Sequence, residues 1–416
     1  MDEARTRQII ELALAGGWLC PSVRAGDRGR ALVVHDLDRV QSRVEELRAA
    51  FPASTLHAVA IKANPVGGVL DHLVGLGCGL EAASRAELRL ALDRLPPERI
   101  VYDAPARTMD ELRLALESGV HLNLDRLGEL ERVRALLGGA RPRGRIGLRV
   151  NPGIGAGRVQ ATSTAVAGSK FGADLLHEEA EIIEAFVQNE WLRGLHVHVG
   201  SYGMSLEQIA EGAASIAALA ERIEAAGGRV DHLDLGGGMP DEGGTFAELA
   251  GAIEAAAPGV LGGERGLVTE MGRSIHAAAG LALSRVEAVR ITGGRRLATI
   301  HLGADLFVRA VYRPAWWRHR ITVHAPDGSP RQGPKAPWDV VGPLCFSGDR
   351  LAKGLLLPEV FEGDIVAVHD AGAYTLSMWS RYNSRPAPGV LAVTGDRAVM
   401  VKAEEAEAEI VGFWGA

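Results

Sequence analysis

The sequence predicts an α/β fold: a (β/α)8 barrel joined to a discontinuous, all-β C-terminal domain. Three observations predict it. The 416 residues are too many for one ordinary domain and suit two. In the middle of the chain, short apolar runs alternate with longer runs of helical periodicity. After Leu281 the runs are short, β-branched and separated by turn clusters. We therefore expect the barrel over residues 38–281, and a β-sandwich or barrel-like domain from residues 1–37 with 282–416.

Eight short runs in the middle of the chain are the expected barrel strands. A helix-like run lies between each pair; in residues 208–228, for example, Ile209, Ile216 and Ile223 recur near a 3.6-residue period and two glycines end the pattern. Eight strand–helix units over roughly 250 residues fit one closed parallel barrel. An open doubly wound sheet is the competing architecture. The expected strands are Leu56–Lys62, Gly79–Ala83, Ile100–Asp103, Leu122–Asp125, Ile146–Asn151, Leu195–Gly200, His232–Leu235 and Leu267–Glu270.

The last third of the chain indicates an antiparallel all-β domain. Its apolar segments are separated by clusters such as TGGRR, APDGSPRQGPK and TGDR, which are typical of turns. Near the start of the chain, Ala31–His35 reads ALVVH and precedes the first barrel helix, so we expect it to pair with the C-terminal sheet. The expected strands of this domain are Val286–Thr292, Leu297–Gly303, Arg320–His324, Asp339–Val341, Asp364–Asp370 and Gly389–Val393.

Composition excludes several classes of partner. The formal net charge is -7 and no run of Lys or Arg stands out, which argues against nucleic acid or an anionic membrane surface. No apolar run is long enough to span a bilayer, and the acidic, amphipathic N-terminus does not resemble a signal peptide. The three cysteines are scattered, so we expect neither a disulfide framework nor a structural zinc site, and a cytoplasmic location.

Lys62 stands at the end of the first expected strand. In a (β/α)8 barrel the reacting residues lie at the C-terminal ends of the strands. A buried ammonium group is costly unless it is paired, and such a lysine suits Schiff-base chemistry with an aldehyde cofactor. A lysine that ends a strand and points into solvent is the alternative. Other polar residues at or near strand ends are Glu81, Asp103, Asp125, Arg149, Asn151, His198 and Ser201.

The loops after the seventh and eighth strands carry features of a phosphate site. Gly236, Gly237 and Gly238 follow the seventh strand, and consecutive glycines let backbone N–H groups approach an anion. Barrel phosphate sites favour these two loops, and Arg273 adds a charged donor; a flexible turn is the alternative. Glu270, just before it, can keep a pyridine nitrogen protonated, or it can cap the helix that follows.

His196 and His198 are two residues apart in HVHVG and therefore face the same side of a strand. That spacing suits a metal ion, but no third ligand is evident in the run, so we expect no metal. An imidazole stacked on the face of a planar cofactor is the alternative.

Together these residues resemble the PLP-dependent fold-type III decarboxylases, a family that includes diaminopimelate and ornithine decarboxylases. The motifs occur in the family's order and span nearly the whole chain, which favours the closed barrel and the Schiff-base lysine. They are AIKANP (60–65), EAASRAEL (81–88), LRVNP (148–152), SKFG (169–172), HVHVGS (196–201), LDLGGGMP (233–240), EMGRS (270–274), VGPLCFSGD (341–349) and DAGAY (370–374).

The resemblance implies a cofactor, pyridoxal 5'-phosphate (PLP), and a role for each matching residue. Lys62 holds PLP covalently, His198 stacks on its ring, and Glu270 pairs with the pyridinium nitrogen. Cys345 is expected to enter the active site of the other subunit of a homodimer and to help protonate the product carbon. The phosphate is expected beside Ser201, Gly236, Gly237, Gly238, Arg273 and Tyr374, and the remaining cofactor-site residues are Glu81, Arg149 and Gly272.

Two departures from the family concern the substrate. Phe346 follows Cys345 where we expect an acidic residue that meets the substrate's distal amine, and a phenyl ring cannot form an ion pair with an ammonium. In LFVRAVYRPAWW (306–317) the spacing of an Arg and a Tyr that hold a distal carboxylate is altered, and two adjacent tryptophans either line the pocket or pack the sheet. The candidate substrate residues are Arg273, Arg309, Tyr312, Arg313, Phe346, Asp349 and Tyr374.

We therefore expect PLP-dependent decarboxylation of a small amino acid, with a non-standard or specialised substrate. A standard diaminopimelate decarboxylase and a PLP-dependent racemase or epimerase are the alternatives; alanine racemases share the architecture but need a proton carrier on each ring face. A non-catalytic relative would have lost Lys62, His198 or Glu270, and all three are present.

Overall fold

The computed structural model describes residues 1–20, 28–239 and 244–415, which form two compact units. The barrel unit comprises Gln41–Lys62 and Asp71–Ile275. The β unit comprises Met1–Val40, Ala63–Leu70 and His276–Ala416. Pro240, which ends the LDLGGGMP motif, and residues 21–27 of the expected β domain lie outside the described residues.

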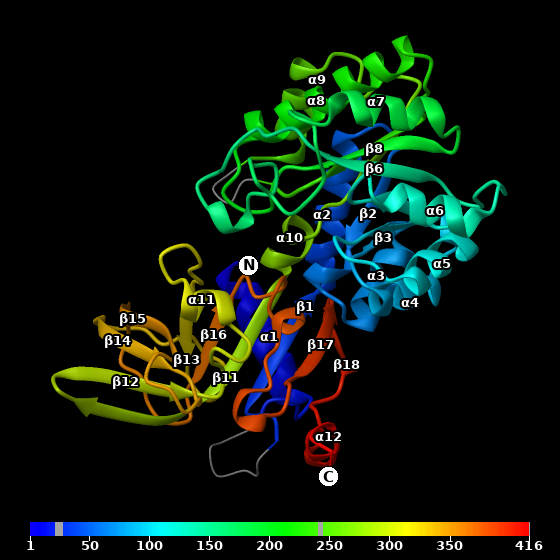
Figure 1. Ribbon diagram of the computed structural model, residues 1–416. Helices are drawn as coiled ribbons and strands as arrows, with labels where there is room; N and C mark the ends of the chain where they lie inside the picture. Colours follow the sequence, from blue (N-terminus) through cyan, green and yellow to red (C-terminus); the bar gives the residue numbers. More distant parts are fainter. Residues whose placement is uncertain (21–27, 240–243, 416) are drawn as a thin grey trace. The chain divides into compact units, whose positions relative to one another are not determined.

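Eight parallel strands form a closed barrel in the first unit (Figure 1). β10 pairs with both β9 and β2, and β5 pairs with β6, which closes the ring. The prediction of a closed barrel is confirmed, because each expected run overlaps one of these strands, and the open sheet is excluded. The strands are β2 (Leu56–Ala60), β3 (Gly79–Ala82), β4 (Ile100–Asp103), β5 (His121–Leu124), β6 (Ile146–Asn151), β8 (Leu192–His198), β9 (His232–Gly236) and β10 (Gly266–Thr269); a short β7 (Ala173–Asp174) pairs with β6 outside the ring.

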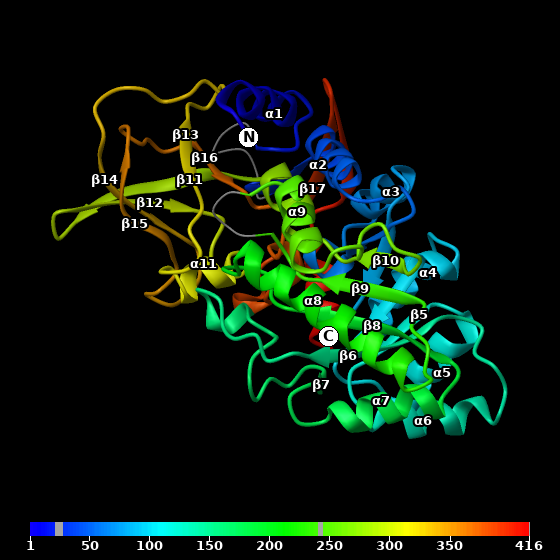
Figure 2. The same ribbon diagram turned by 90° about the horizontal axis from the view of Figure 1, so that it is seen from above.

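Three of the barrel helices begin at capping side chains that the sequence supplies. α5 (Met109–Ser118), α8 (Leu206–Ala225) and α9 (Phe246–Ala256) each start with a reciprocal capping box, which stabilises a helix by about 1 kcal/mol. Both views show α8 and α9 side by side (Figure 2). The other helices along this part of the chain are α2 (Leu37–Ala50), α3 (Gly67–Gly75), α4 (Arg85–Leu92), α6 (Glu129–Leu137), α7 (Glu179–Gln188) and α10 (Arg273–His276), with 3-10 turns at Ile61–Ala63, Pro97–Arg99, Gln160–Thr162 and Ala277–Ala279.

The β unit is a nine-stranded sheet in which the first strand of the chain lies among the last ones. β1 (Ala31–Asp36) pairs with β11 (Gly280–Thr292) and β17 (Gly389–Thr394), so the expected pairing of Ala31–His35 with the C-terminal sheet is confirmed. The other strands are β12 (Arg295–Ile300), β13 (Ile321–His324), β14 (Ala336–Val341), β15 (Arg350–Leu357), β16 (Ile365–His369) and β18 (Arg397–Lys402).

The expectation of a purely antiparallel sheet is wrong at two places. β1 runs parallel to β17, and β12 runs parallel to β14. Neither pair is joined by a hairpin turn: the whole barrel and more separates β1 from β17, and α11 (Val308–Tyr312) and β13 lie between β12 and β14. Only a tight hairpin forces two strands to run antiparallel.

The sheet of the β unit has apolar residues on both faces. Leu32 and Val34 of β1 pack in a cluster with Ile9 and Ile10 of α1 (Glu3–Ala15). Val33, which points the other way, belongs to a second cluster with residues of β11, β12, β14 and β16. Two more 3-10 turns, at Leu376–Met378 and Tyr382–Ser384, and α12 (Glu407–Phe413) complete the unit. None of the helices in the described ranges is both long and apolar enough to span a membrane.

Candidate functional site

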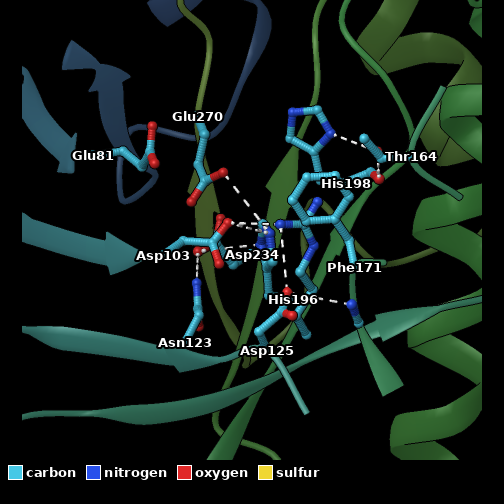
Figure 3. Close-up of polar contacts among 12 residues, drawn as sticks. Glu81, Asp103, Asn123, Asp125, Thr164, Phe171, His196, His198, Asp234 and Glu270 are labelled. Carbon is cyan, nitrogen blue, oxygen red and sulfur yellow. Dashed lines mark hydrogen bonds and ion pairs between the residues drawn. The ribbon is translucent and has the colours of Figure 1, made fainter. Parts of the chain in front are cut away.

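Polar side chains from successive strands meet inside the barrel near the C-terminal ends of the strands (Figure 3). Side chains alternate between the two faces of a strand, so in β9 the apolar Leu233 and Leu235 face away from Asp234. Burying polar groups costs free energy unless they pair, so this concentration of charge indicates a functional site and not a packed core. The side chains, each at most 5% exposed, are Glu81, Asp103, Asn123, Arg149, His196, Asp234 and Glu270.

Lys62 is paired and does not simply point into solvent. It lies in the 3-10 turn that follows β2, and its Nζ is 2.6 Å from Oε2 of Glu81 on the neighbouring β3. Its side chain is 33% exposed, whereas that of Glu81 is fully buried. Burial raises the pKa of Glu81 even though the ammonium group of Lys62 opposes this shift. The pair leaves the amine within reach of a ligand at the barrel mouth.

Arg149 of β6 is held by two carboxylates and an aromatic ring. Its Nη1 lies 3.1 Å from Asp103 Oδ2 and 3.9 Å from Asp125 Oδ1. Its guanidinium carbon lies 4.6 Å from the centroid of the Phe171 ring. Burial alone would raise the pKa of Asp103, but Arg149, together with His196, holds that pKa well below its ordinary value.

His196 of β8 lies among three carboxylates (Figure 3). Its Nε2 is 3.4 Å from Asp103 Oδ2 and 3.9 Å from Glu270 Oε2, and its Nδ1 is 3.6 Å from Asp234 Oδ2. Asp103, His196 and Glu270 each offer one ligand-type atom, and these atoms lie within 4.8 Å of one another. The fold thus brings to His196 acidic partners that are not evident in the HVHVG run.

His198 faces the same interior as His196. A Cβ atom placed on Gly236 would lie 2.8 Å from Cε1 of His196 and 2.9 Å from Cδ2 of His198. The Nδ1 of His198 is 3.0 Å from the hydroxyl of Thr164, which also donates to the His198 carbonyl. Burial and the nearby cations lower the pKa of His198 well below its ordinary value, so its imidazole is neutral.

The glycine run after β9 lies against the loop after β8. A Cβ on Gly238 would lie 2.7 Å from the Ser201 carbonyl oxygen, and one on Gly237, whose φ is +124°, would lie 3.0 Å from that of Gly200. The Gly238 amide donates to the Gly200 carbonyl oxygen at 2.9 Å. The fold therefore requires glycine here for two loops to meet, and it places the run beside Ser201.

Arg273 and Gly272 lie at the start of α10. Arg273 is the first residue of that helix, and its guanidinium carbon lies 4.3 Å from the centroid of the Tyr202 ring, in the same loop as Ser201. The Gly272 carbonyl accepts a hydrogen bond from the Ile275 amide at 3.1 Å. An arginine ordered by an aromatic ring at a helix start is suited to binding an anion.

The other expected site residues lie in the β unit. Arg309 of α11 lies between two aromatic rings, with its guanidinium carbon 4.4 Å from the centroid of Tyr374 and 5.4 Å from that of Trp317. Tyr374 has a left-handed backbone with φ of 54°, and its amide donates to the Ala63 carbonyl. Arg313 follows α11 and is exposed.

Phe346 belongs to an aromatic cluster that we define as Tyr312, Phe346 and Tyr382. It stacks on Tyr312 with ring centroids 5.8 Å apart and an interplanar angle of 9°, and it meets Tyr382 edge-on at 6.1 Å. Tyr312 is 62% exposed and Tyr382 is 48% exposed. The exposed Cys345 precedes Phe346, and its amide donates to Oδ1 of Asn383 at 2.8 Å.

The carboxylate of Asp349 is hydrogen-bonded to backbone amides of neighbouring loops. Its carboxylate accepts hydrogen bonds from the amides of Ala304 at 2.7 Å and Leu344 at 2.8 Å. A Cβ on Gly342 would lie 2.2 Å from one of its oxygens. In this structure, Asp349 holds the Cys345 loop in place and does not present a free carboxylate.

Comparison with known proteins identifies the family. Residues 37–277, more than half of the chain, match the family described as pyridoxal-dependent decarboxylase, pyridoxal binding domain. The chain belongs to this family. The diaminopimelate decarboxylase of Pseudomonas fluorescens is 35% identical to this chain over 362 residues, which cover 84% of each of the two chains. That of Aquifex aeolicus is 30% identical over 387 residues, which cover 91% of this chain and 90% of the relative.

Solved structures agree with the sequence comparison. The diaminopimelate decarboxylase of Helicobacter pylori, complexed with L-lysine, superposes with a TM-score of 0.82 at 28% identity and covers 92% of this chain and 96% of its own. The lysine/ornithine decarboxylase of Vibrio vulnificus has a TM-score of 0.77 at 23% identity and shows the shared fold alone. The protein is thus a PLP-dependent amino-acid decarboxylase, and the racemase alternative is set aside.

The interior of the decarboxylase's barrel fits PLP. Both carboxylate oxygens of Glu270 are buried and lack a hydrogen-bond partner among the described residues, which suits a donor such as a protonated pyridine nitrogen. Because neither oxygen accepts a hydrogen bond from the described residues, Glu270 does not cap the helix that follows. Lys62 offers an amine, and the glycine run with Ser201 and Arg273 offers an anion site.

Three residues of this interior were assigned no site role from the sequence: Asn123 and Asp234, which were not singled out, and His196, which was considered only as one of the HVHVG pair. A signal for them was available, because each is a polar residue flanked by apolar ones in a barrel strand. In a closed barrel, whose outer face is covered by helices, such a residue faces the interior.

Proposed function

We propose that the decarboxylase acts on an amino acid whose distal end carries no free ammonium group, with Lys62 as the residue that holds PLP. The aromatic cluster of Tyr312, Phe346 and Tyr382 carries this proposal. The family resemblance implies that the residue after Cys345 meets the distal end of the substrate, and here that residue is a phenylalanine between two tyrosine rings. A desolvated ammonium without a partner would cost several kcal/mol there.

Each residue has a separate task in this proposal. When bound, PLP supplies an electron sink for the pair that remains as carbon dioxide leaves. Glu270 holds a proton at the pyridine nitrogen, and the Lys62 amine attaches the cofactor. Ser201, Gly236–Gly238 and Arg273 would bind the phosphate, and the neutral His198 would contact the ring. Glu81 and Arg149 complete the wall of the cofactor site.

Two arginines are the candidates for binding the distal end of the substrate in this proposal. Arg309, held between Trp317 and Tyr374, offers a pre-ordered guanidinium to a carboxylate or amide oxygen, and Arg313 offers a second. Holding the bond to the leaving carboxylate perpendicular to the cofactor ring, in a poorly solvated site, lowers the barrier to its cleavage.

We further propose that the protein is a homodimer with shared active sites, in which the partner subunit's Cys345 donates a proton to the product carbon. The family resemblance and the exposure of Cys345 support this assignment. We also propose a cytoplasmic location, because Cys20, Cys78 and Cys345 are all free thiols and an exposed thiol persists in a reducing compartment.

Diaminopimelate itself is the second candidate substrate. The relatives with 30–35% identity and more than four-fifths coverage are named for it. A pre-ordered arginine such as Arg309 would suit its distal carboxylate.

Carbon dioxide release from a panel of amino acids distinguishes the two candidates. The PLP-loaded protein and a Lys62→Ala control are assayed with meso-diaminopimelate, L- and D-ornithine, L- and D-lysine, arginine, glutamate and aromatic amino acids. We expect the highest kcat/KM with a substrate that lacks a distal ammonium, and no release by the control. If meso-diaminopimelate or ornithine is the best substrate, the proposed substrate class is wrong.

A further inference from the structure

His196 lies at the centre of the barrel and has no role in the reaction described so far. Its side chain is completely buried, and its two ring nitrogens face carboxylates from three different parts of the barrel. Asp103 ends β4, Asp234 lies in β9, and Glu270 follows β10. None of these three nitrogen–carboxylate distances is shorter than 3.4 Å, so the imidazole lies between the carboxylates and is not bonded tightly to one of them.

The neighbouring cations Lys62 and Arg149 pair with carboxylates other than Asp234 and Glu270. Lys62 pairs with Glu81, and Arg149 pairs with Asp103 and Asp125. Within the described residues, the ion pairs of Asp234 and Glu270 are both with His196. Asp234 also accepts a 2.7 Å hydrogen bond from the Asn123 amide, which fixes the carboxylate that faces His196 Nδ1.

We propose that His196 is a positioning residue, held as an imidazolium ion, whose charge favours the carboxylate form of Glu270 and orients that carboxylate toward the pyridine nitrogen of PLP. This inference rests on the proposed role of Glu270. The positive charge favours the carboxylate form of Glu270, whose burial otherwise favours the neutral acid. Asp103 and Asp234 hold the imidazolium in place, and Asn123 holds Asp234.

The electrostatics of the barrel support the charge on His196. Burial by itself lowers the pKa of His196, but Glu270, Asp234 and Asp103 more than offset this and hold that pKa well above its ordinary value. Burial, with Asp234 adding to it, holds the pKa of Glu270 well above its ordinary value, and the charge on His196 opposes this shift. The nearby imidazoles of His198 and His121 have pKa values well below the ordinary one and are neutral, while Lys62 and Arg149 face Glu81 and Asp103.

The pH dependence of kcat in the PLP-loaded enzyme tests the proposal. His196→Gln removes the charge and leaves a polar side chain, so the pKa of Glu270 rises further. The acidic limb of the kcat profile then moves to higher pH by about one unit or more, which is about a tenfold loss of kcat on that limb, with little change in KM. His196→Lys restores a cation and returns the limb toward its wild-type position.

A matched control separates charge from packing. His121 is also a buried barrel histidine, and it packs edge-on against His232 at 4.2 Å. We expect His121→Gln to leave the acidic limb in place, because the neutral His121 ring makes no ion pair with Glu270. If His196→Gln and His121→Gln lower kcat equally at all pH values, then His196 has only a packing role and the proposal is overturned.

A second readout does not depend on activity. NMR of the cofactor-free wild-type protein, labelled with 13C at histidine Cε1 and assigned with His196→Gln, reports the charge of His196 directly. We expect an imidazolium signal that persists above pH 8. A neutral signal at pH 7, or a stoichiometric metal ion found by elemental analysis and bound through Asp103, His196 and Glu270, would overturn the proposal. Failure of the proposed function appears instead as a wild-type enzyme that releases no carbon dioxide.

Discussion

At the scale of single residues, buried charges are the most informative feature of this protein. Glu81, Asp103, Asp234 and Glu270 are at most 4% exposed and come from four different segments of one barrel. Their partners are distant in sequence: His196 is 93 residues from Asp103 and 74 from Glu270. The candidate roles of Lys62, Glu270 and Arg273 could be predicted from strand ends and motifs, whereas the ion pairs of His196 could not, because only the closed barrel creates them.

Breaking the buried pair of Arg149 and Asp103 should destabilise the fold. We expect Asp103→Asn to lower the free energy of unfolding by about 3–5 kcal/mol at pH 7, because it removes one partner of a buried ion pair. Asp71→Asn is the matched control, since the pair of Asp71 with Arg94 is exposed at Asp71 and should contribute about 0–1 kcal/mol. Urea or thermal unfolding of the cofactor-free proteins measures both.

The pH dependence of this difference follows from the sign of the Asp103 shift. The pKa of Asp103 in the folded protein is well below its ordinary value. Its stabilising effect is therefore complete above the ordinary aspartate pKa near about 4 and is lost as the pH falls through the folded-state pKa. A difference between wild type and Asp103→Asn that grew on acidification would contradict this account.

Replacing Phe346 by glutamate tests the proposed substrate class at one position. A carboxylate there can pair with a distal ammonium, so we expect Phe346→Glu to raise kcat/KM for meso-diaminopimelate relative to wild type by about tenfold, equivalent to about 1.4 kcal/mol of transition-state binding. Phe346→Gln is the control, because glutamine has nearly the same shape as glutamate but carries no charge. Equal kcat/KM values for the two variants would mean that Phe346 does not meet the distal group.

At the scale of elements, the barrel strands could be predicted closely, whereas two edge strands of the β unit could not. β15 and β18, the two ends of the strand path in that sheet, were absent from the expectation. Both are largely exposed or half-buried, so they lack the apolar pattern that marks a buried strand, and β15 also contains Gly354 at φ +61°. The direction of these strands could not be predicted either, because the apolar pattern of a short strand does not show whether its partner runs parallel or antiparallel to it.

The loop that carries Cys345 is hydrogen-bonded to a second loop, at Asn383 and Ser384, whose backbone is left-handed. Asn383 and Ser384 both have positive φ, and Asn383 Oδ1 accepts the 2.8 Å hydrogen bond from the Cys345 amide. We expect Asn383→Ala to speed alkylation of Cys345 by iodoacetamide by about threefold or more, because the variant loses this bond, worth roughly 1 kcal/mol, and strains the left-handed turn. Asn383→Gly is the second variant: it also removes the hydrogen bond, but glycine adopts the left-handed backbone without strain.

Mass spectrometry of the alkylated peptides gives the rate for each cysteine. The buried Cys20 and Cys78 serve as internal references for intact folding. If Cys345 reacts at the wild-type rate in both variants, the contact with Asn383 does not order the loop.

At the scale of the whole molecule, the proposed homodimer makes a quantitative prediction. Lys62→Ala and Cys345→Ala each remove one residue of every proposed site, and a mixed dimer contains one intact site and one doubly altered site. Random reassociation of equal amounts of the two inactive proteins should therefore restore about a quarter of wild-type carbon dioxide release. No recovery after confirmed subunit exchange would show that Lys62 and Cys345 act within one chain.

The central claim is that Lys62 carries PLP, and borohydride reduction tests it most directly. The chain has only five lysines, Lys62, Lys170, Lys335, Lys353 and Lys402, so peptide mass mapping can assign a reduced pyridoxyl group without ambiguity. We predict one pyridoxyl group per chain, on Lys62, and loss of the visible PLP absorbance in Lys62→Ala. A label on any of the other four lysines, or an undiminished absorbance in Lys62→Ala, would contradict the account.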